Sequence, residues 1–240
     1  MLSSLKASAQ IVFLASFSCL VAGCATPGTS EFQYRAPSGP GSVTNETIVK
    51  LPFSDTWDLL IGQLAKGFFV INNVEKVSRI INVSFSTDKP EEYVECGTSV
   101  RSFKYADESQ TFTYPTASSS SYKTTGSWGP YNNLPVVAYI ERKTSLEGRI
   151  NIYVAPKDND TIVTVNSRYI VSSNSSGQQE LINGAGTVVQ RLPLPNKANS
   201  LSFNTGQVGS ADWGGPDKAN LVKCYSTGKL ESEILEMIRR

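Results

Sequence analysis

Histidine is absent from this chain of 240 residues, and its absence limits the chemistry that the protein can perform. Histidine is the usual general base at neutral pH, the commonest zinc ligand and the usual pH-sensitive switch. The sequence also lacks a Gly-x-Ser-x-Gly nucleophile elbow, and no histidine is present to activate a serine. Paired carboxylates remain as candidate acid–base groups. The composition therefore favours a protein that is not an enzyme, and it indicates no cofactor.

An excess of charge of one sign is lacking as well. The chain has 22 lysines and arginines against 21 aspartates and glutamates. Proteins that bind nucleic acid normally carry an excess of basic residues or a stripe of basic residues on one face. Because neither is present, we expect no nucleic-acid partner.

Cysteine is scarce, with four copies, and two of them lie near the N-terminus. An apolar run over residues 11–20 follows a short region whose only charge is Lys6, which is the layout of a signal peptide. The run is shorter than the roughly 20 residues that a membrane span needs. Val21-Ala22-Gly23-Cys24 ends this segment and resembles the lipobox of bacterial lipoproteins.

The lipobox resemblance implies a location and a modification. Residues 1–23 would be removed as a lipoprotein signal peptide, together with Cys19, and the sulfur of Cys24 would carry a diacylglycerol anchor. Ala25 stands where an aspartate would direct retention in the inner membrane, so the resemblance implies the outer membrane, on its periplasmic side. The alternative is an ordinary secretory peptide, or a signal anchor, with a cysteine nearby by chance.

The two remaining cysteines, Cys96 and Cys224, form an even pair in a chain that we expect to be exported. A disulfide between them is therefore predicted. The alternative is two free buried thiols. Two cysteines without histidine do not make a standard zinc site, so we expect no metal centre.

The composition divides the chain into a tether and a folded region. Residues 24–44 are rich in proline, glycine and serine with little apolar content, which predicts a flexible tether. Residues 45–240 are expected to form a single domain. Within it, the segments at about 104–134 and 172–218 are rich in serine, threonine and glycine and are predicted to be long loop insertions.

Periodicity predicts two helices and several strands in the folded region. Trp57, Leu60, Ile61 and Leu64 share one helical face. A closing helix is predicted to begin near residues 227–228, with Leu230, Ile234, Met237 and Ile238 on one face. Alternating or continuous apolar runs predict strands at 47–51, 68–71, 81–85, 136–140, 150–154 and 163–169, the last three as an antiparallel meander. This order predicts an α+β fold, an antiparallel sheet with two amphipathic helices on one face.

The order of elements is similar to that of the helix-grip domain, which occurs in a lipoprotein component of the bacterial β-barrel assembly machinery. The entry from strand to helix at 51–60 and the strand pair up to Phe85 carry this resemblance. It implies a helix packed across a curved antiparallel sheet. This chain departs from that lipoprotein by having one such domain instead of two and by its large Ser/Thr-rich insertion.

Aromatic side chains scattered among small polar residues are the candidate binding groups. Tyrosine and tryptophan provide contact area at a low entropic cost. The predicted partner- or glycan-binding residues are Tyr114, Tyr122, Trp128, Tyr131 and Trp213. The alternative is a mobile insertion whose aromatic rings pin it to the sheet. The acidic cluster Glu91, Glu92 and Glu95 could supply catalytic acids, but we interpret it as a solvated strand end, because no facing partner or pocket is indicated.

These observations predict a lipid-anchored, periplasm-facing envelope protein that acts as a non-enzymatic binding or assembly module. Its partners would be the membrane, through the anchor, and another envelope protein. One alternative is a carrier of a small ligand in a helix-grip cavity beneath the C-terminal helix. A second is a carboxylate-based enzyme that acts on glycans.

Overall fold

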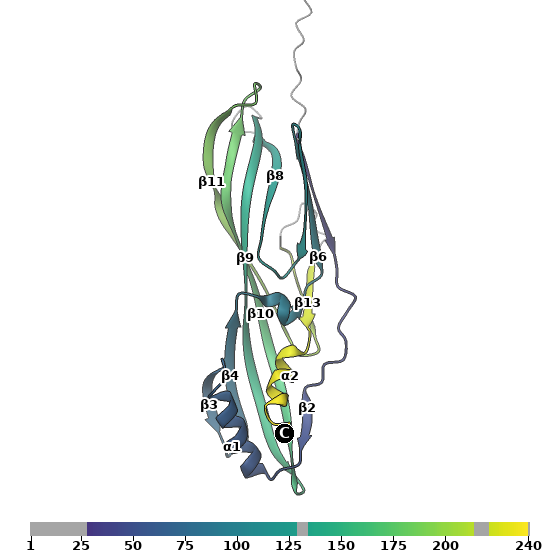
Figure 1. Cartoon of the computed structure of the whole chain (residues 1–240), viewed down its shortest axis with the longest axis vertical. Coiled ribbons are helices and arrows are strands. Elements are labelled where there is room, and N and C mark those ends of the chain that lie inside the picture. The colour runs from purple at the N-terminus through teal and green to yellow at the C-terminus, as the bar shows by residue number, and fades with distance from the viewer. Residues whose placement is uncertain (1–27, 129–133, 214–220, 240) are drawn as a thin grey trace, which may run out of the picture.

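The computed structural model describes residues 28–128, 134–213 and 221–239, and it shows a long, narrow molecule built mainly from β-strands (Figure 1). About 62% of the structure is strand and 12% is helix. The predicted α+β fold with two helices on one sheet is therefore wrong, and the fold is largely β. Helices α1 (Phe53–Leu64) and α2 (Lys229–Glu236) do form, but they cover only the lower end of the molecule in Figure 1.

Thirteen strands are present in the described part of the chain, with a short 3₁₀ helix, η1 (Pro90–Glu92). The strands are β1 (Thr29–Arg35), β2 (Glu46–Val49), β3 (Val70–Glu75), β4 (Ile80–Thr87), β5 (Val94–Glu95), β6 (Thr98–Tyr105), β7 (Glu108–Pro115), β8 (Ser120–Trp128), β9 (Leu134–Lys157), β10 (Asp160–Ile182), β11 (Val188–Asn204), β12 (Val208–Ala211) and β13 (Val222–Ser226).

The antiparallel pair β9 and β10 forms the spine of the molecule. Strand β9 has 24 residues and pairs with β10 along nearly its whole length. At about 3.4 Å per residue, such a strand spans roughly 80 Å. The apolar runs at 136–140 and 150–154, which were predicted to be separate strands, both lie in β9. The spine therefore belongs to both halves of the molecule.

The lower half is a sheet with the order β2-β10-β9-β4-β3, covered on one face by the two helices. Helix α1 forms where its periodicity predicted, because Trp57, Leu60 and Leu64 fall on one face and are buried. They pack into the same core as inward-facing strand residues such as Ile150 and Val163. This half has the dense apolar core that the sequence pattern indicated.

A buried polar network attaches α2 to the spine. Glu231 is completely buried in the first turn of α2, and the Tyr169 hydroxyl of β10 lies 2.7 and 2.8 Å from its two carboxylate oxygens. The Thr205 hydroxyl donates to Glu231 Oε1 at 2.7 Å, and the Ser226 hydroxyl donates to the Tyr169 oxygen at 2.9 Å. Hydroxyl groups from two separate segments therefore donate to this carboxylate, and a third, that of Ser226, donates to the Tyr169 hydroxyl.

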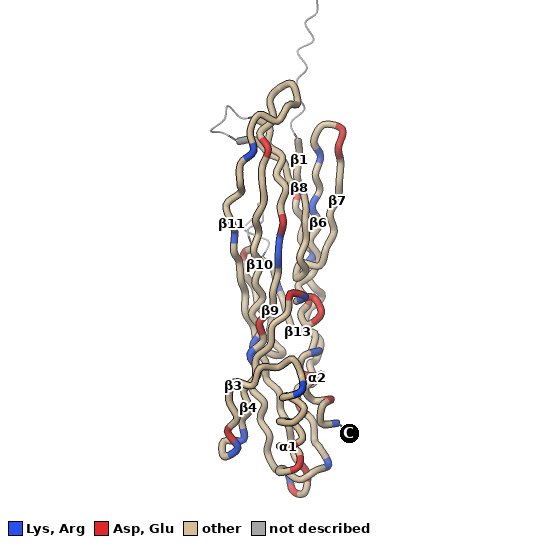
Figure 2. The backbone as a smooth tube through the Cα atoms, turned by 60° about the vertical axis from the view of Figure 1, so that its left-hand side comes forward, with Lys and Arg blue, Asp and Glu red and all other residues tan. Residues whose placement is uncertain are grey.

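The upper half consists of two sheets packed face to face. The sheet β1-β6-β7 lies against the upper part of β8, β9, β10 and β11 (Figures 1 and 2). A small cluster of Phe103, Val137 and Ile182 joins them. Figure 2 also shows that basic and acidic residues are spread along the length of the molecule.

The upper half corrects three predictions. The segment at 104–134 was predicted to be a loop but contains β7 and β8, and the one at 172–218 contains the end of β10 together with β11 and β12. Residues 29–35, placed in the flexible tether, form β1 and pair with β6. Serine, threonine and glycine are frequent in β8 and in the end of β10, and the other strands carry many polar residues, so their composition concealed them.

The third sheet, β12-β13-β5, connects the two halves and contains the predicted disulfide. Cys96 and Cys224 are bonded, which confirms that prediction. Gly97 follows directly with a φ of 75°, and a Cβ atom there would meet the Arg35 carbonyl oxygen. In the described residues, no helix is long and apolar enough to cross a membrane.

Candidate functional site

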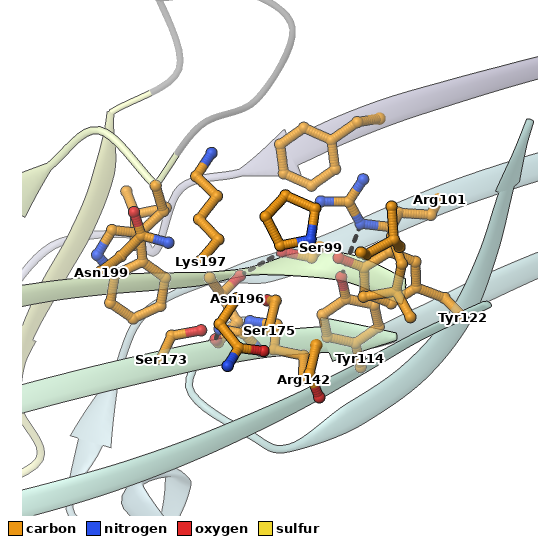
Figure 3. A pocket seen from close by; sticks show the side chains of 18 residues that line it. Ser99, Arg101, Tyr114, Tyr122, Arg142, Ser173, Ser175, Asn196, Lys197 and Asn199 are labelled. Carbon is orange, nitrogen blue, oxygen red and sulfur yellow. Dashed lines mark hydrogen bonds between the residues drawn. The ribbon is translucent and has the colours of Figure 1, made fainter. Parts of the chain in front are cut away.

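A cavity of about 470 Å³ lies between the two sheets of the upper half, at the level where they approach β13 (Figure 3). Its volume is in the usual range for small-molecule sites, about 300–1,000 Å³. Side chains from β1, β6, β7, β8, β9, β10, β11 and β13 contribute to its walls. Because the cavity depends on the packing of both sheets, no single sequence segment defines it.

One wall is a ladder of aromatic rings and arginines that crosses both sheets. Going along it, the members are Phe32, Arg101, Tyr122, Tyr114, Arg142 and Trp213. Each neighbouring pair is a cation–π contact or a ring stack, and both types of contact are attractive and hold the two groups against each other. The ladder therefore fixes two positive charges at defined positions in the wall.

Arg101, on β6, lies between two rings in this ladder. Its guanidinium carbon is 4.3 Å from the centroids of both the Phe32 and the Tyr122 rings. Its Nε donates a 3.0 Å hydrogen bond to the Tyr114 hydroxyl, drawn as a dashed line in Figure 3. The two rings and the hydroxyl fix the direction of the guanidinium, and its Nη atoms have no partner among the described residues.

Arg142, on β9, is more deeply buried, with 7% of the residue exposed. Its Nη1 donates to the Ser118 carbonyl at 2.6 Å, and its Nη2 donates to the Thr116 carbonyl. Its guanidinium carbon is 5.8 Å from the Tyr114 ring centroid and 5.3 Å from that of Trp213. Burial lowers the pKa of Arg142, because water no longer stabilises the charge.

The opposite wall is polar and comes from β10 and β11. Ser173 and Ser175 of β10 and Asn196, Lys197 and Asn199 of β11 line it, and Figure 3 shows them across the cavity from Arg101 and Tyr122. Lys197 is exposed at the rim and has no described ion-pair partner. The cavity thus presents hydroxyl and amide groups opposite the cationic ladder.

The electrostatics of the cavity are one-sided. Three basic residues line it, Arg101, Arg142 and Lys197, and none of the described lining residues is an aspartate or a glutamate. None of the three forms an ion pair in the part of the chain that the structure describes. Burial also raises the pKa of Tyr122, which keeps its phenol neutral. The site therefore carries net positive charge.

Three of the five predicted binding aromatics meet in this cavity: Tyr114, Tyr122 and Trp213. Trp128 ends β8, and its side chain lies outside the described part of the structure, as do Tyr131 and the predicted lipidation site Cys24. The sequence interpretation missed Arg101 and Arg142. The alternation of buried and exposed side chains in β9 could have identified Arg142, because Arg142, Thr144 and Leu146 are successive inward positions of this strand.

The predicted acidic cluster forms no site of its own. Glu92 accepts a 2.9 Å hydrogen bond from Lys229, which lowers the pKa of that exposed carboxyl, and Glu95 Oε1 accepts a 2.7 Å hydrogen bond from the Gly97 amide. The region beneath α2 is also filled, since Leu230 and Ile234 are completely buried in the core. In the described residues, no group of cysteines, aspartates and glutamates is arranged to hold a metal ion.

Comparison of the chain with models of protein families, with curated proteins and with solved structures found no match.

Proposed function

We propose that this protein is a non-enzymatic binding module of the bacterial envelope, anchored by a lipid on Cys24 to the periplasmic side of the outer membrane. Its binding site is the cavity between the two upper sheets. The observation that carries the proposal is the pair of arginines held in the cavity wall, neither of which forms an ion pair with a described carboxylate. A buried or half-buried charge without a counter-ion is unfavourable, so such a site favours a ligand that supplies one.

The side chains around the cavity suit binding better than catalysis. The described lining has no aspartate, glutamate or cysteine, and the chain has no histidine. Tyrosine and serine hydroxyls remain, but burial raises the pKa of Tyr122 and makes it a poorer proton donor. General acid–base catalysis normally relies on a histidine or a carboxylate, and the described lining contains neither.

The position of β1 adds a geometric argument. Only residues 25–28 separate Cys24 from Thr29, the first residue of β1. Five residue steps reach at most about 18 Å. Thr29 pairs with Lys104, next to the β6–β7 turn, so a lipid on Cys24 would hold that end of the molecule near the membrane. The cavity belongs to the same half, and its ligand would therefore be met close to the membrane surface.

The anchor is tested with Cys24→Ser. We expect an unlipidated or uncleaved precursor, since only a thiol accepts the diacylglycerol group. Processing is read by mass spectrometry, and anchoring by partition into detergent. A variant that is still cleaved and still partitions with detergent would overturn the lipoprotein assignment.

The binding site is tested by photo-crosslinking in intact cells. A photoreactive amino acid at Asn196, on the cavity wall, should capture a specific envelope component. The matched position is Lys157, exposed at the opposite end of the spine, which should capture nothing specific. Equal capture at both positions, or none at Asn196, would contradict the proposed site.

A further inference from the structure

The two arginines in the cavity wall have no negatively charged partner among the described residues. The Thr116 and Ser118 carbonyl oxygens accept two hydrogen bonds from Arg142, but carbonyls carry only partial charges and leave the guanidinium without an ionic partner. Arg101 has its Nε bonded to a neutral phenol and its Nη atoms uncommitted among the described groups. Guanidinium groups pair best with carboxylates and phosphates, often through two parallel hydrogen bonds. The ladder therefore selects an anionic group.

The remainder of the cavity suits a polyhydroxylated ligand. The wall opposite the ladder offers the hydroxyls of Ser173 and Ser175 and the amides of Asn196 and Asn199. No described protein partner engages these side chains, so their hydrogen-bonding capacity is open to a ligand. An acyl chain would leave these polar groups unpaired, which is unfavourable. Sugar hydroxyls, in contrast, pair with both hydroxyl and amide side chains.

The aromatic rings also limit how a ligand can lie. Tyr114 and Tyr122 stack on each other with centroids 6.0 Å apart, and Arg101 covers the other face of Tyr122. Arg142 in turn lies 5.8 Å from the Tyr114 ring centroid, so both tyrosine rings are engaged within the ladder and offer a neutral sugar little free face for stacking. An acidic group, in contrast, can reach the guanidinium nitrogens of Arg101.

We propose that this cavity binds an acidic saccharide, a sugar unit that bears a carboxylate or a phosphate. The proposal rests on the proposed function of the same cavity and names its class of ligand. The acid group pairs with Arg101 and Arg142, while the ring hydroxyls face β10 and β11. Lys197 at the rim adds attraction for the incoming anion.

Matched pairs of sugars test this assignment on the full-length chain purified in detergent micelles. N-acetylmuramic acid is compared with N-acetylglucosamine, which lacks its carboxylate, and glucose 6-phosphate is compared with glucose. Affinity is measured by ligand-observed NMR and titration calorimetry. We expect the acidic member of at least one pair to bind at least tenfold more tightly than its neutral counterpart. The pair that shows this difference in affinity tells whether the cavity prefers a carboxylate or a phosphate.

Charge-neutralising variants locate the binding. Arg101→Gln and Lys197→Gln should each weaken binding of the acidic sugar, Arg101→Gln by tenfold or more. The control is Arg149→Gln, an exposed arginine of β9 whose side chain is on the outer face of the spine, and it should bind normally. Circular dichroism verifies that each variant is folded. If Arg101→Gln does not fold, Lys197→Gln still tests the proposal.

Three results would overturn the assignment. They are equal affinity for the acidic and neutral members of both pairs, no binding of either acid up to about 10 mM, and full binding by both cavity variants. Capture of a protein or a lipid by the Asn196 crosslinker, with no binding of acidic sugars, would refute this ligand class while supporting the proposed function. Absence of any specific crosslink would instead refute the proposed function.

Discussion

Removing the Tyr169 hydroxyl is the most direct test of how the C-terminal helix is held. The change Tyr169→Phe keeps the buried ring, which stacks on Phe203 with centroids 5.2 Å apart, and deletes only the oxygen. That oxygen donates to the Glu231 carboxylate and accepts from the Ser226 hydroxyl at 2.9 Å. The substitution therefore isolates one polar contact between β10 and α2.

The expected loss follows from the burial of Glu231, which has 0% exposure. A hydrogen bond to a charged group contributes about 1.5–3 kcal/mol, and leaving a buried acceptor short of a donor adds to the loss. The Thr205 hydroxyl continues to donate to Glu231, at 2.7 Å, and so limits the loss of stability. We therefore expect Tyr169→Phe to lower the free energy of unfolding by about 2–4 kcal/mol.

Urea denaturation followed by circular dichroism measures this loss, with the slope of the transition as a check on two-state behaviour. The matched control is Tyr153→Phe, on the outer face of the spine, where the tyrosine is 43% exposed and has no described hydrogen bond. This control should change stability by less than about 0.5 kcal/mol. Equal stability of Tyr169→Phe and Tyr153→Phe would refute the idea that the network holds α2.

The same phenol predicts a dependence on alkaline pH. Burial, and then the nearby Glu231 charge, strongly raise the pKa of Tyr169 in the folded state. In the unfolded chain it loses its proton near pH 10. Above that pH the unfolded state binds fewer protons than the folded state, so the free energy of unfolding falls as pH rises. Tyr169→Phe lacks this contribution, and its deficit relative to the wild type should shrink above pH 10.

Further tests address the core, the disulfide and a close contact in the spine. Trp57→Ala should lower the free energy of unfolding by about 3–5 kcal/mol, because it empties a buried position under α1; an unchanged melting temperature would contradict the packing. Reduction of Cys96–Cys224, which closes a loop with a separation of 128 residues, should lower stability by a few kcal/mol and increase hydrogen exchange in α2 first; equal exchange in both redox states would argue against this. Gly148→Ala should lower the free energy of unfolding by about 1–3 kcal/mol, since its Cβ would collide with the Phe85 ring, while Gly126→Ala has open space and serves as the control in the same urea titration.

Sequence patterns predicted the elements that face the apolar core. Helix α1 was identified because its buried positions are tryptophan and leucine at helical spacing. The disulfide was identified by elimination among four cysteines and is confirmed. In β9, the apolar runs were found at both ends, around Val137 and Ile152, but the stretch between them was not recognised as strand.

The reason lies in what the missed strands face. Between its apolar runs, β9 keeps strict alternation, but the inward residues are Arg142 and Thr144. In β10 the corresponding inward residues are Ser173 and Ser175. These side chains face the cavity rather than an apolar core, so the hydrophobic signal disappears where the candidate site begins. The sequence-based prediction thus failed around the candidate site, and local sequence rules are often broken where a site is built.

The placement of β1 determines how the molecule would resist a pulling force on its N-terminus. A pull on the N-terminus, directed away from the domain, acts along β1 and loads its ladder with β6 in shear. Hydrogen bonds in an antiparallel ladder run perpendicular to the strands, so the seven paired rows from Thr29↔Lys104 to Arg35↔Thr98 resist together instead of opening one by one. Beyond Thr98 the load reaches Cys96, whose bond to Cys224 transfers it covalently to β13. A pull on the N-terminal segment would thus pass along the cavity wall at Phe32 and end in a covalent bond.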